Sequence, residues 1–135
     1  MRCFQVRFVF ALSLFLLLAV CLNGEYSLIA KSRYVSIYGS GRTAESTLRL
    51  RQELDEGIDE IQMQTGVYVD GGPDIYIVGD DQAYKLLTQE HQGIVEFSDA
   101  FYSSYEKRVW VKPLESLKGN YIKVLIHEYT HWYLD

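Results

Sequence analysis

The chain has 135 residues, of which 48% are hydrophobic and 23% are charged, so its length and composition suit one compact domain and exclude a disordered tail. Thirteen basic residues against 18 acidic ones give a formal charge of −5. This charge disfavours a general nucleic-acid binder and a polybasic protein of membrane surfaces, so we expect no nucleic-acid partner.

The first 24 residues have the pattern of a signal peptide. Two arginines precede an apolar stretch at residues 8–22, and the chain then becomes polar again. This stretch is shorter than the roughly 20 apolar residues that comfortably span a bilayer. A signal anchor formed by residues 8–22, with membrane association through them, is one alternative, and lipidation at Cys21 is another. We expect an exported protein, extracellular or in the cell envelope, whose folded domain is residues 25–135.

The two cysteines, Cys3 and Cys21, both lie inside the predicted signal segment. The exported domain is therefore expected to contain no thiol, no disulfide and no cysteine metal ligand. Without the segment the chain keeps 11 basic and 18 acidic residues, a formal charge of −7. We expect an acidic domain that is stabilised by packing.

The first half of the domain predicts alternating strands and helices. Residues 33–38 alternate and are rich in β-branched and aromatic side chains, which predicts a strand before Gly39-Ser40-Gly41. From about residue 43 to 64, apolar residues recur every three or four positions and predict an amphipathic helix that ends at Gly66. Residues 67–69 suggest a short extended segment, and residues 74–78 give the clearest strand pattern.

The second half continues the same alternation. Asp80-Asp81 predicts the N-cap of a short helix at about residues 82–89, and residues 93–102 fit either a strand or a loop. Charged residues flank a predicted strand at residues 107–112, which is typical of a sheet edge. A last helix, residues 121–134, is apolar on most sides and is predicted to be buried. The fold class expected is α+β, a small mixed sheet with helices packed on it.

The last predicted helix contains His127-Glu128-Tyr129-Thr130-His131, the HExxH pattern. Residues four apart project from the same helix face, so His127 and His131 can bind one Zn²⁺. Glu128 can then accept a proton from the zinc-bound water and act as the general base of peptide-bond hydrolysis. The structural alternative is two hydrogen-bonded core histidines and a surface carboxylate.

The run at residues 123–132, KVLIHEYTHW, strongly resembles the active-site helix of the peptidase MA-like group of gluzincin metallopeptidases. A weaker resemblance extends over about residues 34–135. It implies a zincin-like N-terminal subdomain that ends in the HExxH helix, with zinc at His127 and His131 and Glu128 as base. It also implies an extended peptide or protein substrate that pairs along the predicted strand at residues 109–112.

One part of the family's pattern is missing. In gluzincins a third zinc ligand, usually a Glu on a later helix, completes the site, whereas this sequence ends four residues after His131. The side chains of Trp132, Tyr133 and Leu134 would also lack cover. We therefore expect a C-terminally incomplete domain, poorly active by itself, or a site that is completed differently. Asp135 shares the face of the two histidines. The other carboxylates and the third histidine are expected to be solvated: Glu96, Asp99, Glu106 and His91.

Two further functions stay open. The chain could be a non-catalytic peptide-binding module of the same fold, or a membrane-anchored interaction protein that keeps residues 8–22. Glu128→Gln would separate the first from an enzyme, because it removes the base and leaves peptide binding at a sheet edge intact.

Overall fold

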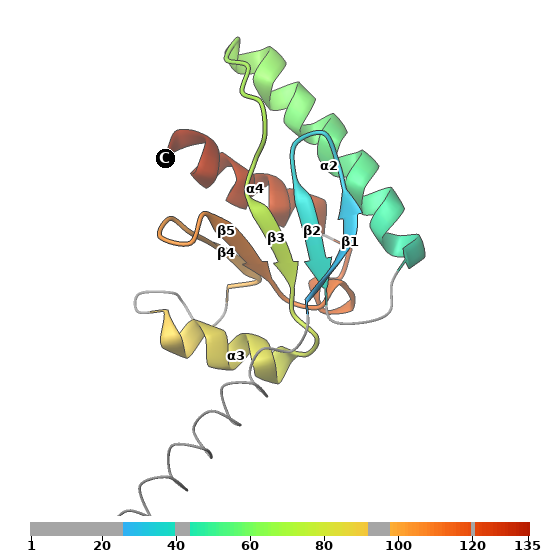
Figure 1. Cartoon of the computed structure of the whole chain (residues 1–135), viewed down its shortest axis with the longest axis vertical. Coiled ribbons are helices and arrows are strands. Elements are labelled where there is room, and N and C mark those ends of the chain that lie inside the picture. Colours follow the sequence, from blue (N-terminus) through green and yellow to red (C-terminus); the bar gives the residue numbers. More distant parts are fainter. Residues whose placement is uncertain (1–25, 40–43, 92–97, 120) are drawn as a thin grey trace, which may run out of the picture.

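The computed structural model describes residues 26–39, 44–91, 98–119 and 121–135, so the predicted signal peptide lies outside the described residues. Within them, one mixed sheet has the strand order β1-β2-β3-β5-β4 (Figure 1). The strands are β1 (Ser27–Lys31), β2 (Ser36–Gly39), β3 (Asp74–Ile77), β4 (Ala100–Ser103) and β5 (Arg108–Val111). Strands β2, β3 and β5 are parallel, and β1 and β4 pair antiparallel at the two edges. The predicted α+β class with a small mixed sheet is confirmed.

Helices cover both faces of this sheet (Figure 1). Helices α2 (Ala44–Thr65) and α4 (Tyr121–Leu134) contribute to one hydrophobic cluster, and α3 (Asp81–Glu90) contributes to a second cluster on the opposite face. A single 3₁₀ turn, η1 (Leu114–Leu117), lies between β5 and α4. Helix α4, which carries the HExxH motif, therefore lies on the same side of the sheet as α2.

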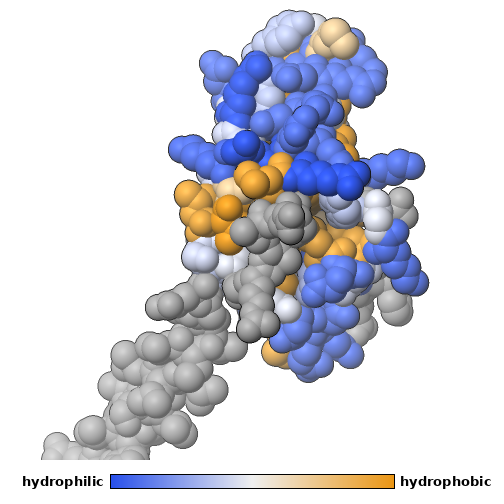
Figure 2. All heavy atoms as spheres, turned by 90° about the vertical axis from the view of Figure 1, so that its right-hand side faces the viewer, coloured by the Kyte–Doolittle hydropathy of each residue, from blue (hydrophilic) through white to orange (hydrophobic). Residues whose placement is uncertain are grey.

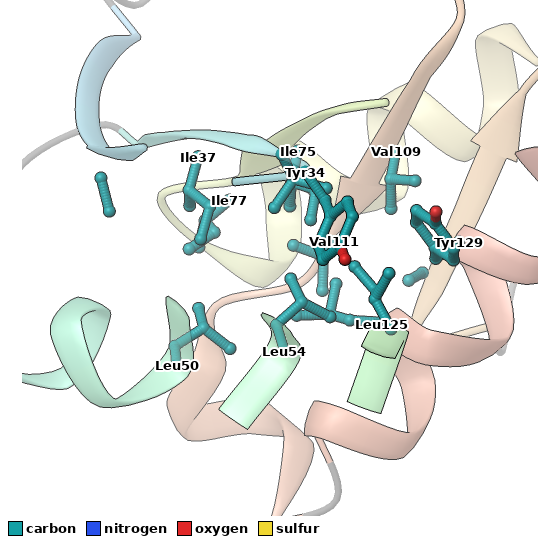
Figure 3. Close-up of a cluster of buried hydrophobic side chains, with 14 of the residues drawn as sticks. Tyr34, Ile37, Leu50, Leu54, Ile75, Ile77, Val109, Val111, Leu125 and Tyr129 are labelled. Carbon is teal, nitrogen blue, oxygen red and sulfur yellow. The ribbon is translucent and has the colours of Figure 1, made fainter. Parts of the chain in front are cut away.

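The main core forms where the apolar stripes of α2 and α4 meet the sheet (Figure 3). Leu50, Leu54 and Ile58 of α2 are fully buried, as their three- to four-residue spacing predicts. Ile75 and Val109 lie opposite them on neighbouring strands. Burial of each such side chain is worth about 1.5–3 kcal/mol, so this cluster fixes α4 on the sheet.

Aromatic side chains cross the other face of the sheet in register. Tyr38, Tyr76, Trp110 and Phe101 are partners on β2, β3, β5 and β4. The rings of Tyr38 and Tyr76 stack with centroids 4.8 Å apart, and those of Tyr76 and Trp110 are 4.9 Å apart. The fully buried Tyr84 of α3 packs on Phe101, so α3 covers this row at its β4 end.

Most elements confirm the sequence prediction. The long helix ends at Gly66, which has a positive φ of 70° and donates its N–H to the carbonyl of Gln62. The Asp80 carboxylate caps α3 by accepting a hydrogen bond from the N–H of Ala83 at 2.7 Å. Strand β3 and helix α4 also lie where the pattern placed them.

The strands differ from the sequence prediction at three places. The strand predicted at residues 33–38 begins only at Ser36, because Ser32 donates its N–H to the Val35 carbonyl and closes a turn between β1 and β2. Strand β1 was not predicted. Residues 67–69 form no strand, and the Val69 backbone bonds instead to the Gln62 side chain.

The surface above α2 is largely hydrophilic. Figure 2 shows the face on the right of Figure 1, with polar side chains over most of its upper part and apolar side chains gathered near mid-height. Leu28 and Leu48 are among the large apolar side chains that are more than half exposed, at 53% and 58%. None of the helices in the described ranges combines the length and the hydropathy that a bilayer crossing requires.

Candidate metal centre

Helix α4 is amphipathic, and this arrangement puts the two histidines of the motif at the surface. Leu125 and Tyr129 are buried in the core, whereas His127 and His131, on the other side of the helix, are exposed. The prediction of a helix buried on most sides is therefore wrong. One face of α4 anchors the helix, and the two histidines are left free to bind a ligand from solvent.

The structure brings His127 and His131 together. Their Nε2 atoms are 3.2 Å apart, and the two rings are perpendicular with centroids 4.7 Å apart. Two nitrogens that each bind a tetrahedral zinc at about 2.0–2.1 Å lie about 3.3 Å from each other. The separation therefore matches that of two zinc ligands, and it equally suits a hydrogen bond from one neutral imidazole to the other.

Glu128 lies beside the two histidines but on the buried side of the helix, with 8% of its surface exposed. Burial raises the pKa of its carboxyl group above the usual value, and the neighbouring His131 and His127, followed by a hydrogen bond from the Tyr102 backbone, act in the opposite direction. A half-desolvated carboxylate of raised pKa is a stronger base than a solvated one. The prediction of a surface acid, the structural alternative, does not describe this residue.

An open depression of about 330 Å³ adjoins the motif between α4 and the start of β4. Its lining from α4 includes His127 and Glu128, so the predicted base and one predicted zinc ligand border the same space. The full lining is Ser98, Asp99, Ala100, Lys123, Val124, His127 and Glu128.

The sheet edge next to this depression is β4 and not β5. Strand β5 pairs with β3 on one side and with β4 on the other, so the prediction that residues 107–112 form an edge strand is wrong. The Asp99 carbonyl accepts the N–H of Lys112 at 3.0 Å. Because bonded residues alternate along an antiparallel pair, Ala100 and Tyr102 point their backbone groups towards the free edge.

Tyr102 is a site residue that the sequence did not reveal. Its backbone is hydrogen-bonded to Glu128, and its hydroxyl donates to Asp135 at 2.9 Å. It therefore joins the edge strand to α4 at two points. Residues 93–102 fitted a strand or a loop, and only the placement of β4 beside α4 distinguishes this tyrosine from the other ten.

None of the described carboxylates completes the histidine pair. Within the described ranges, no group of three or more His, Cys, Asp or Glu side chains is placed to hold a metal ion. Asp135 is engaged by the Tyr102 hydroxyl and by an ion pair with Lys107. Asp99 lines the depression, but its carboxylate pairs with Lys112 at 3.1 Å. Glu96 lies outside the described residues.

Glu106 and His91 form a separate cluster. Glu106 accepts hydrogen bonds from Trp110 Nε1 at 2.9 Å and pairs with His91 Nε2 at 3.3 Å. The His91 ring packs on Phe101, which belongs to the cluster beneath α3. The prediction that both are solvated is wrong, since each is half-buried, and they lie with the α3 side of the sheet rather than with α4.

The end of α4 is covered better than the sequence suggested. The hydroxyl of Tyr133 donates to the Val67 carbonyl at 3.0 Å, and the Trp132 ring lies 5.5 Å from that of Tyr129. Only Leu134 of the three terminal apolar residues is largely exposed, at 77%.

No family model matches the chain, and searches of curated proteins and of solved structures find no significant match. The relation to gluzincins therefore has no support beyond the motif and its geometry.

Proposed function

We propose that the chain is an exported zinc metallopeptidase of the gluzincin type, in which His127 and His131 bind zinc and Glu128 is the general base. The observation that carries this proposal is the 3.2 Å separation of the two Nε2 atoms beside a buried carboxylate. Any two imidazoles four residues apart on a helix can come this close, so the buried carboxylate and the adjacent depression are what separate this pair from chance histidines.

The chemistry assigns a distinct task to each group. Zinc supplies a Lewis acid that polarises the scissile carbonyl and makes water a nucleophile near neutral pH. Glu128 accepts the proton of the attacking water and later delivers it to the departing amine. The Tyr102 backbone holds the Glu128 carboxylate against the edge strand, so that its proton-accepting oxygen keeps one position.

The substrate pairs with the edge of β4 at Ala100, because Glu128 already occupies the outward backbone of Tyr102. Ala100 both lines the depression and points its backbone groups outward, so an extended peptide can add to the sheet there by main-chain hydrogen bonds. This replaces the docking strand expected at residues 109–112. The side chains that line the depression, among them Lys123, His127 and Glu128, then lie beside the scissile bond.

A second candidate function, a non-catalytic peptide-binding module, also has a supporting observation. A catalytic zinc usually has three protein ligands, and the described residues supply only the two histidines. A non-catalytic peptide-binding module would use the same β4 edge with no metal. Export and any anchoring by residues 8–22 are part of the proposal, and N-terminal sequencing of the mature protein tests them.

The deciding experiment is the zinc content of the purified protein by elemental analysis. We expect one zinc per chain, lost in His131→Ala and kept in His91→Ala, which removes a histidine from the other side of the sheet. Glu128→Gln should keep the zinc and lose hydrolysis of a casein or peptide substrate. A protein that binds no zinc at micromolar concentrations would refute the enzyme and favour the binding module.

A further inference from the structure

The depression beside the motif carries one cation whose charge no described residue neutralises. Lys123 lies in the first turn of α4, four residues before His127, and lines the depression with an exposed side chain. No ion pair or hydrogen bond joins its ammonium group to another described residue. The group is therefore available to a ligand.

The acidic residues of the same lining are already engaged. The Asp99 carboxylate pairs with Lys112 Nζ at 3.1 Å, so the two charges largely cancel. Glu128 is buried beside the two histidines and receives a hydrogen bond from the Tyr102 backbone. Lys123 is left as the uncompensated charge of the depression.

We propose that Lys123 selects substrates that carry a carboxylate on a residue next to the scissile bond. The inference rests on the proposed function and names its substrate class. A peptide paired at Ala100 places a neighbouring side chain in the depression, whose volume of about 330 Å³ accommodates one. Lys123 supplies a flexible point charge that can follow a carboxylate of Asp, of Glu or of a chain terminus.

The preference must come from this local contact. The domain at residues 25–135 has a formal charge of −7, so its overall field repels anionic peptides. A contact between an exposed ammonium and a carboxylate changes binding by about fivefold at most, and salt weakens it. We therefore expect a moderate preference that falls as ionic strength rises.

The test uses quenched fluorescent peptides with blocked ends that differ only in Glu, Gln or Lys, placed on either side of the scissile bond. The protein should cleave the Glu peptide with a kcat/KM about fivefold above that of the Gln peptide. Lys123→Gln should abolish the difference, and Lys123→Glu should reverse it towards the Lys peptide. Lys118→Gln removes a lysine that does not line the depression and should change nothing. A matching set with free C-termini shows whether a terminal carboxylate is the preferred ligand.

Binding of the same peptides to Glu128→Gln, measured by fluorescence anisotropy, separates this inference from the proposed function. Binding that favours Glu without any hydrolysis by the parent protein would sustain the role of Lys123 and refute the enzyme. Hydrolysis with equal rates for Glu and Gln, or with a preference for Lys, would overturn the inference alone. If the protein neither binds nor hydrolyses the peptides, both the inference and the proposed function are overturned.

Discussion

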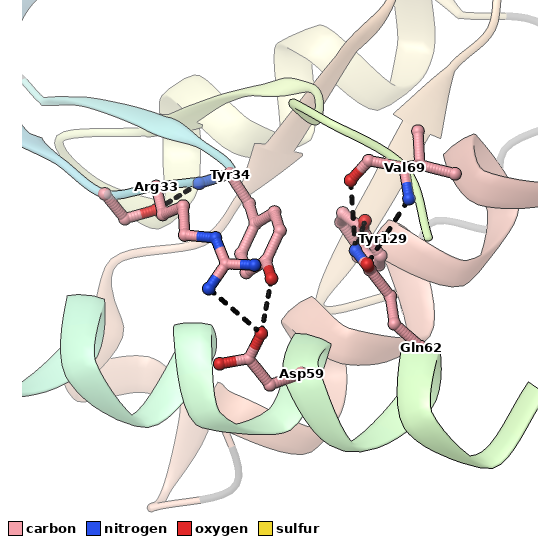
Figure 4. A network of polar contacts seen from close by, with 7 residues as sticks. Arg33, Tyr34, Asp59, Gln62, Val69 and Tyr129 are labelled. Atoms are coloured by element: carbon pink, nitrogen blue, oxygen red, sulfur yellow. Dashed lines mark hydrogen bonds and ion pairs between the residues drawn. The ribbon is translucent and has the colours of Figure 1, made fainter. Parts of the chain in front are cut away.

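Gln62 is the buried polar residue that holds the end of α2 to the segment leading into β3. Only 2% of its surface is exposed. Its amide nitrogen donates to the Val69 carbonyl at 3.2 Å and its amide oxygen accepts the Val69 N–H at 3.3 Å (Figure 4). A third, longer contact of 3.4 Å joins it to the hydroxyl of Tyr129 on α4. The Gln62 side chain thus supplies hydrogen-bond partners to a backbone segment that belongs to no strand.

Gln62→Ala removes these bonds and leaves the N–H and carbonyl of Val69 without the partners that they have in the folded protein. Val69 is only half-buried, so each of its two backbone groups should cost about 1 kcal/mol, the low end of the range of about 1–3 kcal/mol for an unsatisfied buried group. We therefore expect a loss of about 2 kcal/mol in the free energy of unfolding. For a domain of this size the loss corresponds to a fall in Tm of about 8 °C.

The measurement is urea unfolding followed by circular dichroism, with Gln64→Ala as the matched control. Gln64 is on the same helix but exposed, and its amide only contacts Glu60 at 3.0 Å. The control should change stability by less than about 0.5 kcal/mol, and the gain in helix propensity is the same in both variants. Equal costs for the two variants would refute the role given to the Val69 contacts.

Two other perturbations test the packing and the charge network. Gly72→Ala should cost about 1–3 kcal/mol in urea unfolding, because a Cβ there would lie 2.8 Å from the Tyr34 carbonyl oxygen, a backbone atom that cannot move aside; unchanged stability would contradict the close contact. Burial alone would raise the pKa of Glu106, but hydrogen bonds from Trp110 and His91 outweigh it and lower the pKa below 4.5. The ionised carboxylate therefore contributes stability that is complete above the unfolded pKa and is lost as pH falls through the lower folded value, so the advantage over Glu106→Gln should disappear in acid melts. A constant difference down to pH 2 would contradict this.

The parts of the fold that follow from local spacing could be predicted. The stripe of Leu50, Leu54 and Ile58 requires a helix with one buried face, and Gly66 ends it with a conformation that other residues rarely adopt. The turn between β1 and β2 was missed because Ser32 closes it with a side-chain and a backbone hydrogen bond, which hydrophobic alternation does not reveal.

The order of strands in the sheet could not be predicted from the sequence. Charges on both sides of residues 108–111 suggested an edge, yet they mark only the ends of a short strand whose middle is buried between β3 and β4. Strand β4 has no such marker. Its edge position follows from pairing with a strand that lies later in the chain, and a pairing of this kind leaves no local pattern.

The candidate site likewise combines a local feature, which the sequence predicts, with a non-local environment, which it does not. The pairing of His127 with His131 is a consequence of helix geometry alone, and the sequence predicts it from a spacing of four. The environment that would make the pair chemically useful is not local, because Tyr102 and Ala100 come from a strand that reaches α4 only in the folded sheet. The tests of zinc binding and of Lys123 therefore address different things: the first examines the histidine pair that helix geometry produces, and the second examines the depression that α4 forms with the start of β4.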